Sequence, residues 1–556
     1  MTDHLKIALV QANPTVGDVA GNAALIRTAR AEAASAGADL VLFSELFLIG
    51  YPPEDLVLKP ALQDAIAQTL QALAAETGDG GPALLIGAPW VDQGADQGQV
   101  YNAMLLCDGG QIAAIRYKHD LPNYGVFDEK RVFTSGPMPG PVNFRGVRLG
   151  IPICEDIWQR DVVECLAETG AEILLVPNGS PYEVDKADAR MNRAVARVTE
   201  SGLPLVYVNQ YGGQDELVFD GGSFVLNSDC SLAVQMPHWR EGLVITHWTR
   251  EANGWRCAPG ERGAPPDEME AIYQAMMLGL RDYVNKNRFP GVLIGLSGGI
   301  DSALSAAVAV DALGAERVHC VMMPYIYTAQ ESLDDAADCA RLLGVRYDIV
   351  PIKPAVDAFM QMLAPQFAGR APDITEENMQ SRARGLLLMA LSNKFGAMVL
   401  TTGNKSEVSV GYATLYGDMC GGYNALKDIY KMTVFALSHW RNQHHPAGAL
   451  GPAGRVIPEN IITRPPSAEL RADQKDEDSL PPYAVLDDIL NCLVEQEMSV
   501  ADIVARGHAL DVVKRIQNLL YIAEYKRRQA APGVKISRKL FGRDRRYPIT
   551  NRFRDV

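Results

Sequence analysis

The second half of the chain is organised around one hexapeptide, Ser297-Gly298-Gly299-Ile300-Asp301-Ser302. An apolar run, Gly291–Leu296, precedes it, and an alanine-rich segment, Ala303–Leu313, follows. This order predicts a buried strand, a glycine turn and a helix. Because glycine has no Cβ, backbone N–H groups can turn inward, and the helix adds the positive end of its dipole. The hexapeptide therefore predicts a phosphate-binding loop.

The loop is not of the Walker type, since the G-x-x-x-x-G-K-[ST] spacing is missing and no lysine follows the glycines. An ordinary strand-to-helix turn is the alternative interpretation of a glycine pair. The two serines and Asp301 favour phosphate, because they provide hydroxyl donors and a carboxylate suited to a metal ion. The hexapeptide resembles the pyrophosphate loop of the ATP pyrophosphatase family, whose members cleave ATP to AMP and pyrophosphate.

Length and composition predict a globular protein of at least two domains. The chain has 556 residues, of which 47% are hydrophobic and 21% charged. No run of 18 apolar residues occurs, and residues 1–6 lack the apolar core of a signal peptide. We therefore expect a cytoplasmic protein with no membrane partner.

Charge and cysteine usage exclude two further classes. A formal net charge of −15 repels nucleic acid over most of the surface, so no nucleic-acid partner is expected. The nine cysteines are scattered without a CxxC pair, which favours reduced thiols over a disulfide framework or a zinc site.

Strand and helix patterns alternate through both halves of the chain. In the first half, strands are expected at 6–11, 39–45, 83–88, 102–107, 112–117, 147–154, 173–177 and 205–209, with helices at 22–36, 60–76, 161–168 and 187–201. The pattern predicts an α/β sandwich. Residues 253–267 are polar and rich in Gly and Pro, so we place the domain boundary between 262 and 263. Domains 1–262 and 263–556 follow, the second a doubly wound parallel sheet.

Three residues with side chains suited to catalysis follow strands in the first domain: Glu45, Lys118 and Cys154. Singly, each has an ordinary interpretation, as a solvated glutamate, a surface lysine and a core cysteine. Together they match the needs of amide hydrolysis, which are a nucleophilic thiol, a base and a donor to the oxyanion. A helix is expected to begin just after Cys154, and its terminus would lower the thiol pKa.

The order of these three residues resembles the nitrilase, or carbon–nitrogen hydrolase, superfamily over about residues 5–250, and the stretch Lys118–Glu129 resembles its glutaminase domains. The resemblance implies Glu45 as general base, Lys118 as oxyanion donor and Cys154 as the residue that forms a glutamyl thioester. It places Glu129 beside the lysine. It assigns glutamine binding to Tyr124, Ser180 and Lys186, the last at a position where relatives can carry arginine.

Two segments of the second domain, Thr401–Glu407 and Ile462–Leu470, resemble NAD synthetases, a likeness that extends over about residues 270–556. The resemblance implies magnesium at Asp301 and Glu407, hard oxygen ligands of the kind this ion prefers. It implies ATP binding by Gly295, Leu296, Ser297, Gly298, Gly299, Ile300, Asp301, Ser302, Thr402, Lys431 and Thr463. It assigns deamido-NAD to Asn378, Glu407, Asp418 and Lys526. Leu415 stands where short ammonia-dependent relatives carry lysine.

Both resemblances together imply a glutaminase fused to an NAD synthetase, a ligase that uses ATP and glutamine to amidate deamido-NAD. Relatives of the synthetase half are dimers or larger, so a homo-oligomer is expected. Three alternatives stay open. They are another amidotransferase of the ATP pyrophosphatase family, a nitrilase-type hydrolase with a nucleotide-sensing module, and an RNA-binding protein that uses the basic segment 526–556.

Overall fold

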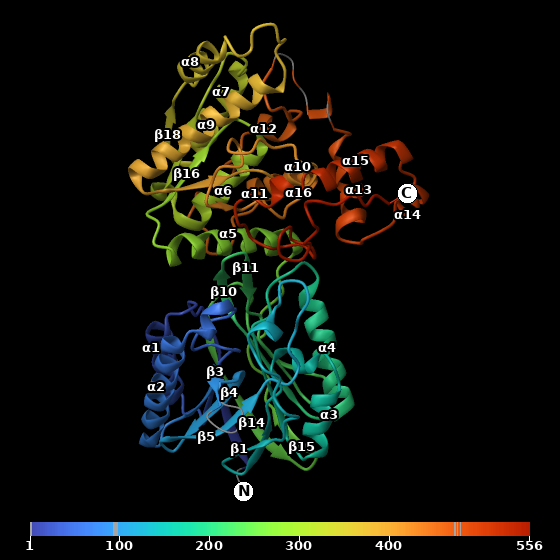
Figure 1. Ribbon diagram of the computed structural model, residues 1–556. Coiled ribbons are helices and arrows are strands. Elements are labelled where there is room, and N and C mark those ends of the chain that lie inside the picture. The colour runs from blue at the N-terminus through green and yellow to red at the C-terminus, as the bar shows by residue number, and fades with distance from the viewer. Residues whose placement is uncertain (1–2, 93–97, 472–473, 475, 479, 556) are drawn as a thin grey trace. The chain divides into compact units, whose positions relative to one another are not determined.

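The computed structural model describes residues 3–92, 98–471, 474, 476–478 and 480–555. The chain divides into two compact units, Met1–Pro266 and Asp267–Val556 (Figure 1). The division falls inside the polar, Gly/Pro-rich stretch 253–267. Across the described residues, every helix is too short or too polar to span a bilayer.

The first unit contains two mixed sheets. One runs in the order β15 (Gly254–Cys257), β14 (Gly242–Glu251), β1 (His4–Gln11), β2 (Leu40–Leu42), β3 (Ala83–Val91), β4 (Val100–Asp108) and β5 (Gln111–Tyr117). The other runs β13 (Leu232–Gln235), β12 (Phe224–Leu226), β9 (Leu205–Asn209), β8 (Ile173–Asn178), β7 (Val147–Gly150) and β6 (Val142–Phe144).

Helices cover the outer faces of both sheets, so the first unit is a four-layer sandwich. Helices α1 (Val19–Ser35) and α2 (Pro60–Glu76) lie on one side, and α3 (Asp161–Glu168) and α4 (Lys186–Ser201) on the other (Figure 1). Strand β1 shows how the layers form: Ile7 and Leu9 join a core between the sheets, and Ala8 joins a core shared with α1 and α2. Both faces of this strand are buried, which explains its continuous apolar run.

The observed sandwich confirms the predicted fold, but some elements differ. The expected strand 39–45 ends at Leu42 and the expected strand 147–154 ends at Gly150, so Glu45 and Cys154 lie in the turns beyond. Strand β6, the hairpin of β10 (Tyr211–Gln214) and β11 (Leu217–Asp220), and β12 to β15 were not predicted. They are short or partly exposed, and their sequences mix glycine and polar residues, which weakens the strand pattern.

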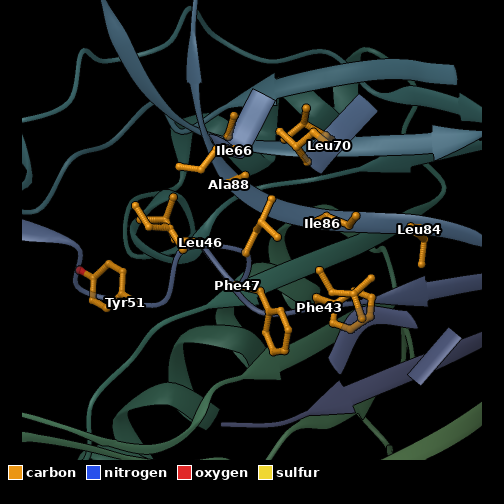
Figure 2. Packing of buried hydrophobic residues seen from close by; sticks show 14 of the residues in the cluster. Phe43, Leu46, Phe47, Tyr51, Ile66, Leu70, Leu84, Ile86 and Ala88 are labelled. Carbon is orange, nitrogen blue, oxygen red and sulfur yellow. The ribbon is translucent and has the colours of Figure 1, made fainter. Parts of the chain in front are cut away.

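The turn that carries Glu45 is packed into the core. Phe43, Leu46 and Phe47 are fully buried, and Figure 2 shows them beside Ile86 and Ala88 of β3 and Leu70 of α2. Tight packing of this kind fixes side-chain positions. The core therefore holds the backbone at Glu45 in one place.

The second unit is built on a five-stranded parallel sheet. Its order is β18 (Arg346–Ile349), β17 (Val318–Met322), β16 (Val292–Gly295), β19 (Met398–Thr401) and β20 (Tyr423–Asn424). Because β16 pairs with β17 on one side and β19 on the other, the strand order changes direction there. In such sheets ligands bind at the carboxyl ends of the strands beside this point. The hexapeptide 297–302 follows β16.

Helices fill the rest of the second unit: α5 (Glu268–Lys286), α6 (Ile300–Leu313), α7 (Gln330–Leu343), α8 (Lys353–Leu363), α9 (Ile374–Phe395), α10 (Lys405–Val410), α11 (Lys431–Gln443), α12 (Glu459–Thr463), α13 (Tyr483–Val494), α14 (Val500–Ala505), α15 (Leu510–Ile522) and α16 (Glu524–Arg527). The alanine-rich α6 is almost wholly buried. Helices α10, α13, α14 and α15 share a separate hydrophobic cluster with Phe541.

Candidate active sites

Four buried side chains meet in the first unit. The Lys118 Nζ donates to Glu45 Oε1 at 2.6 Å and to Glu129 Oε1 at 2.9 Å. The Tyr51 hydroxyl donates to Glu129 Oε1 at 2.8 Å. Burial by itself would lower the pKa of Lys118, but the charges of Glu129 and Glu45 raise it well above its ordinary value. Lys118 is therefore a fixed positive charge, with two carboxylates as counter-ions.

Local backbone geometry places Glu45 in this cluster. The next residue, Leu46, has a positive φ of 50° and redirects the chain. A Cβ at Gly87 would lie 2.4 Å from the Leu46 backbone N, so glycine is required on β3 for this close approach. The Glu45 Oε2 accepts from the Gly179 N–H at 2.9 Å. The carboxylate is thus held at both oxygens.

Cys154 lies beside this cluster and begins a four-residue 3-10 helix, Cys154–Ile157, with a φ of 47°. Burial raises the pKa of its thiol well above the ordinary value, the Glu45 charge adds to this, and Lys118 opposes it. The expectation of a lowered pKa is wrong, because one turn of helix is too weak a dipole to offset burial beside a carboxylate. The thiol is protonated at rest and needs a base to become a nucleophile.

Asp156 is a positioning residue that the sequence pattern did not reveal. Its Oδ1 accepts from the backbone N–H of His119 at 3.1 Å and of Asp120 at 2.8 Å, and its Oδ2 accepts from Ile153 N–H at 2.8 Å. It therefore joins the turn before Cys154 to the residues after Lys118. Burial raises its pKa to about 7.

The residues expected to bind glutamine have different surroundings. Tyr124 is half exposed, and its hydroxyl donates to Glu155 Oε2 at 2.9 Å. Both residues line a cavity of about 330 Å³. The Lys186 Nζ lies 5.4 Å from the centre of the Phe127 ring. Tyr124 also packs against Phe127, with ring centres 5.5 Å apart, so Phe127 links the two expected residues.

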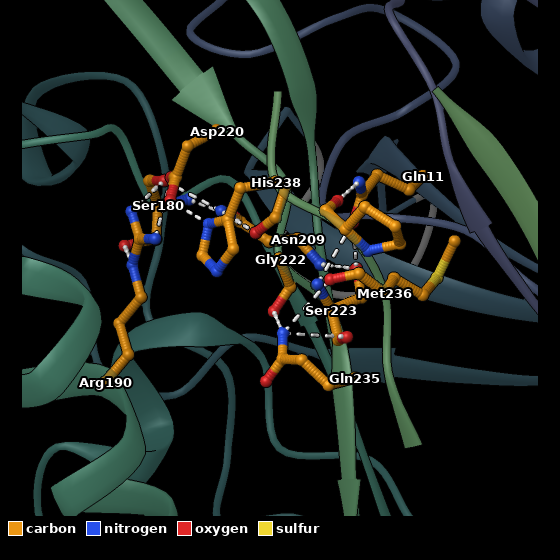
Figure 3. Close-up of polar contacts among 12 residues, drawn as sticks. Gln11, Ser180, Arg190, Asn209, Asp220, Gly222, Ser223, Gln235, Met236 and His238 are labelled. Carbon is orange, nitrogen blue, oxygen red and sulfur yellow. Dashed lines mark hydrogen bonds and ion pairs between the residues drawn. The ribbon is translucent and has the colours of Figure 1, made fainter. Parts of the chain in front are cut away.

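Ser180 is fixed by a buried arginine. The Arg190 Nε donates to Ser180 Oγ at 3.0 Å, and its NH1 group donates to Asp220 Oδ1 at 2.7 Å. Figure 3 shows Arg190 reaching from α4 to Ser180 and Asp220, with His238 on the far side of Asp220. The NH2 group of Arg190 also donates to the Ser180 and Pro181 carbonyls, at 2.8 and 2.9 Å. The geometry gives Arg190 a role in holding the Ser180 turn.

The second unit contains a cavity of about 620 Å³ at the carboxyl ends of β16 and β19. All eight residues 295–302 line it. The Ser297 Oγ and Ser302 Oγ are 3.1 Å apart, and the Gly299 N–H donates to Ser297 Oγ. Gly298 has a φ of 81°, and a Cβ there would lie 2.4 Å from Ser332 O. The predicted glycine turn is present and cannot accept a larger residue at 298.

Charged groups meet beside this loop. The Lys431 Nζ lies 2.5 Å from Asp301 Oδ2 and 3.2 Å from Glu407 Oε1. The Asn404 side chain donates to Asp301 Oδ1 at 2.9 Å and accepts from the Glu407 N–H at 3.0 Å. Burial, against the opposing charge of Lys431, raises the pKa of Glu407 to about 8. Asp301 and Glu407, expected as a pair, are indeed neighbours across one ammonium group.

The residues expected to bind the dinucleotide also line the cavity: Asn378, Glu407, Asp418 and Lys526. Asn378 Oδ1 accepts from the Thr414 hydroxyl at 2.9 Å. The Lys526 Nζ donates to the carbonyls of Gly411 and Ala413, both at 2.7 Å. Burial raises the pKa of Asp418 to about 6. Lys526 thus holds the 411–413 turn.

Thr402 and Lys431 line the cavity as expected, but Thr463 does not. Thr463 is exposed, and its hydroxyl donates to the Glu459 carbonyl inside its own helix. The next residue, Arg464, reaches the cavity wall instead and donates to Ser332 Oγ at 2.7 Å. Arg464 stands in the same segment, Ile462–Leu470, as Thr463 but was not predicted; its positive charge is the sequence feature that could have identified it.

Oxygen ligands for a metal ion are few. Within the described residues, no group of three or more His, Cys, Asp or Glu side chains gathers as metal ligands. Asp301 and Glu407 supply two carboxylates that already converge on a cation, the Lys431 ammonium. Magnesium commonly uses one or two carboxylates together with substrate phosphates, and this pair fits that pattern.

Two family models match the chain, one for each unit. The carbon-nitrogen hydrolase model matches residues 6–255, and the NAD synthase model matches residues 272–530. The glutamine-dependent NAD(+) synthetase of Rhodobacter capsulatus is 55% identical over 556 residues, which is all of both chains.

Solved structures of two related proteins resemble the chain over nearly its whole length. The glutamine-dependent NAD+ synthetase from Acinetobacter baumannii, in complex with adenosine diphosphate, is 44% identical, with a TM-score of 0.78 and 98% of each chain covered. The enzyme from Cytophaga hutchinsonii, at 21% identity and a TM-score of 0.80, shares the fold. Both resemblances predicted from the sequence are confirmed, and the chain belongs to the glutamine-dependent NAD(+) synthetase family.

Proposed function

We propose that this chain hydrolyses glutamine at Cys154 and uses the ammonia, with ATP, to convert deamido-NAD to NAD. The observation that carries the proposal is the presence, in a chain of this family, of two chemically different clusters of side chains. One is the Glu45–Lys118–Cys154 cluster, and the other lines the cavity at the 297–302 loop. The small molecules glutamine, ATP and deamido-NAD are the proposed partners.

The first site supports attack of a thiol on an amide. Glu45 takes the Cys154 proton as Sγ bonds to the carbonyl carbon of glutamine, and the Lys118 ammonium stabilises the oxyanion. Collapse of this intermediate breaks the C–N bond, Glu45 returns the proton, and ammonia leaves. Glu45 then deprotonates a water that attacks the thioester carbon; the C–Sγ bond breaks, glutamate leaves, and Glu45 returns the proton to Sγ. Glu129 keeps Lys118 charged throughout.

Glutamine recognition is proposed for the groups around this centre. Tyr124 and Lys186 flank Phe127, and Ser180 lies in the turn that also brings the Gly179 N–H to Glu45. Lys186 carries an ammonium of the sign that a substrate carboxylate requires, although it lacks the bidentate fork of arginine.

The second site supports activation of a carboxylate by adenylation. The nicotinate carboxylate of deamido-NAD attacks the α-phosphorus of ATP, and pyrophosphate leaves into the N–H-rich loop 297–302. Ammonia then displaces AMP from the acyl adenylate to give the amide of NAD. Lys431 and Thr402 are proposed to contact ATP. Asn378, Asp418 and Lys526 are proposed to hold deamido-NAD in the same cavity.

Magnesium is proposed to be held by Asp301 and Glu407. When bound, it neutralises charge on the phosphates of ATP. The Lys431 ammonium lies between these carboxylates. The Lys431 side chain is long and flexible enough for the ammonium to turn toward phosphate oxygens instead. Lys431 therefore balances the two carboxylates in the absence of ligand.

The proposal is tested by incubating the protein with deamido-NAD, ATP, magnesium and glutamine and measuring AMP and NAD together. Equal amounts of AMP and NAD are expected. AMP without NAD would point to another carboxylate substrate, as in other amidotransferases. Glutamine hydrolysis without AMP would mean that the second unit only senses nucleotide.

We also propose that two or more copies of the chain associate through α9. Leu386 and Met389, three residues apart on this helix, are 64% and 37% exposed. Apolar side chains on one helix face commonly mark an interface. Light scattering should give a mass of at least two chains for the native protein and one for Leu386→Asp. Leu450→Asp, at an equally exposed leucine in a loop, is the control and should leave the mass unchanged.

A further inference from the structure

Lys405 is a fully buried lysine just before Ser406 and Glu407 on α10. Its Nζ has four partners, each within 3.0 Å: Asp428 Oδ1, Glu495 Oε1, Ser537 Oγ and the Lys539 carbonyl. None of these groups belongs to the cavity lining. The ammonium therefore connects the back of α10 to residues more than a hundred positions later in the chain.

The later residues belong to one segment, 535–541, here called the C-terminal clasp. Its backbone makes most of the contacts: the Ile536 and Ser537 N–H groups donate to Asp428 Oδ2 at 2.7 and 2.6 Å. The Lys539 N–H donates to Glu495 Oε2 at 2.9 Å. The Ser537 hydroxyl is 2.9 Å from Asp428 Oδ1 and 2.6 Å from the Lys405 Nζ. Ser537 thus touches both ends of the buried ion pair.

Phe541 closes the clasp. It is 4% exposed, and its ring centre lies 5.7 Å from the Lys405 Nζ and 4.8 Å from the Arg527 guanidinium. Arg527 in turn donates to the Ser409 carbonyl at 2.6 Å, near the end of α10. Cations stacked on an aromatic ring in a desolvated place are well stabilised. Both ends of α10 are therefore attached to the clasp.

Several positive charges of the C-terminal segment are paired within the chain. Lys535 pairs with Asp544 at 3.0 Å, and Arg545 pairs with Glu524 at 3.2 Å. Lys535 and Arg545 are both buried. These pairs assign Lys535 and Arg545 to internal docking, and they favour docking of this part of the segment over an RNA-binding arm.

Helix α10 needs external support. It has six residues, too few to be stable without tertiary contacts. Yet Asn404 at its cap binds Asp301, and Glu407 binds Lys431. Small errors in the placement of such groups reduce catalysis strongly.

We infer that the C-terminal clasp positions α10 for the synthetase reaction and that Lys405 is a positioning residue for Asn404 and Glu407. This inference rests on the proposed function of the second cavity. It assigns Ser537 as the link that keeps the clasp seated on Lys405 and Asp428.

Ser537→Ala is the sharpest test. Removing Lys405 itself would leave Asp428 and Glu495 buried without a counter-charge and would risk unfolding. Lys539→Ala is the matched control, because its side chain is partly exposed and pairs with Glu497 at the surface, while its backbone contacts are kept. Ser537→Thr retains the hydroxyl and serves as the rescue variant.

Three measurements are made on the full chain: NAD formation driven by ammonia, glutamine hydrolysis without other substrates, and the melting temperature. For Ser537→Ala we expect kcat/KM for ATP to fall at least about tenfold, with hydrolysis unchanged. Lys539→Ala should match the native chain, and Ser537→Thr should recover most of the lost activity.

Native activity in Ser537→Ala would overturn the inference, and so would an equal loss of both reactions together with a lower melting temperature. If the native chain itself made no NAD from ammonia, the proposed function would fail before the clasp was tested.

Discussion

Asn102 lies between the two glutamates that hold Lys118. Its Nδ2 donates to Glu45 Oε1 at 2.7 Å and lies 3.5 Å from Glu129 Oε2, and the side chain is buried. An amide that donates to a carboxylate fixes the orientation of that carboxylate. Asn102 therefore supports Glu45 as a base.

We predict that Asn102→Leu, which keeps the volume but loses the donor, reduces glutamine hydrolysis by about ten- to a hundredfold. Ammonia-driven NAD formation should not change. The two rates measured on one preparation check this, and hydrolysis at the native rate would show that Glu45 is held well enough by Lys118 and Gly179.

The raised pKa of Asp156 predicts that the stability of the chain depends on pH. Burial raises its pKa to about 7 from an ordinary value of 3.8. Between these values the folded chain binds more protons than the unfolded chain, so stability falls as pH rises. The contribution of Asp156 to the free energy of unfolding is complete below about pH 4 and is lost as pH rises through 7. The free energy of unfolding falls by up to about 1.4 kcal/mol per pH unit in this range.

The measurement is the difference in melting temperature between the native chain and Asp156→Asn from pH 5 to 8.5. As the pH rises to about 7.5, the melting temperature of the native chain should fall relative to that of Asp156→Asn. Above this pH the difference should stay constant. A difference that did not vary with pH would show that Asp156 is ionised throughout, held by its three N–H donors.

At the scale of single residues, the sequence predicted which residues come together better than it predicted their protonation. Glu45, Lys118 and Glu129 were predicted to act together, and they lie in one hydrogen-bonded cluster. The direction of the Cys154 pKa shift was wrong, because burial depends on packing that sequence spacing does not reveal. Asn102 and Asp156 were missed, since an isolated Asn on a strand and one Asp after Glu155 carry no distinctive pattern.

At the scale of elements, helices with clear apolar spacing were predicted well. Helices 60–76 and 161–168 have the predicted bounds. Strands β10 to β13 and β15 were missed because each has only three or four residues, and β14 was missed because its sequence mixes apolar residues with glycine and charged residues. The roles of Arg190 and of segment 535–541 depend on contacts between distant elements, which one sequence does not specify.

The close approach of β3 to the Glu45 turn makes a prediction at this scale. In Gly87→Ala the new Cβ would lie 2.4 Å from Leu46 N and 2.6 Å from Ser44 O, both backbone atoms that cannot move freely. We expect a loss of about 1–3 kcal/mol in stability and loss of most glutamine hydrolysis.

Gly140→Ala is the matched control, because no atom lies within 4 Å of a Cβ there and its φ is not positive. It should retain native stability and hydrolysis. Comparable behaviour of the two variants would mean that the Glu45 turn tolerates displacement from β3.

At the scale of the whole molecule, one acidic chain contains two units with their own cores and their own sites. A net charge of −15 does not favour anionic substrates at long range, so local donors must bind them. The loop 297–302 and Lys431 supply such donors in the second unit. Two reactions on one chain can therefore be separated by single substitutions, each leaving the other reaction as its internal control.

The most direct measurement is NAD formation by Cys154→Ala with glutamine and, separately, with ammonium salt. Cysteine and alanine differ by the one sulfur atom that the proposed thioester requires. We predict no detectable NAD from glutamine and a native rate from ammonia. NAD formation from glutamine at the native rate would contradict the assignment of Cys154 as the nucleophile, and loss of both reactions would contradict the independence of the two sites.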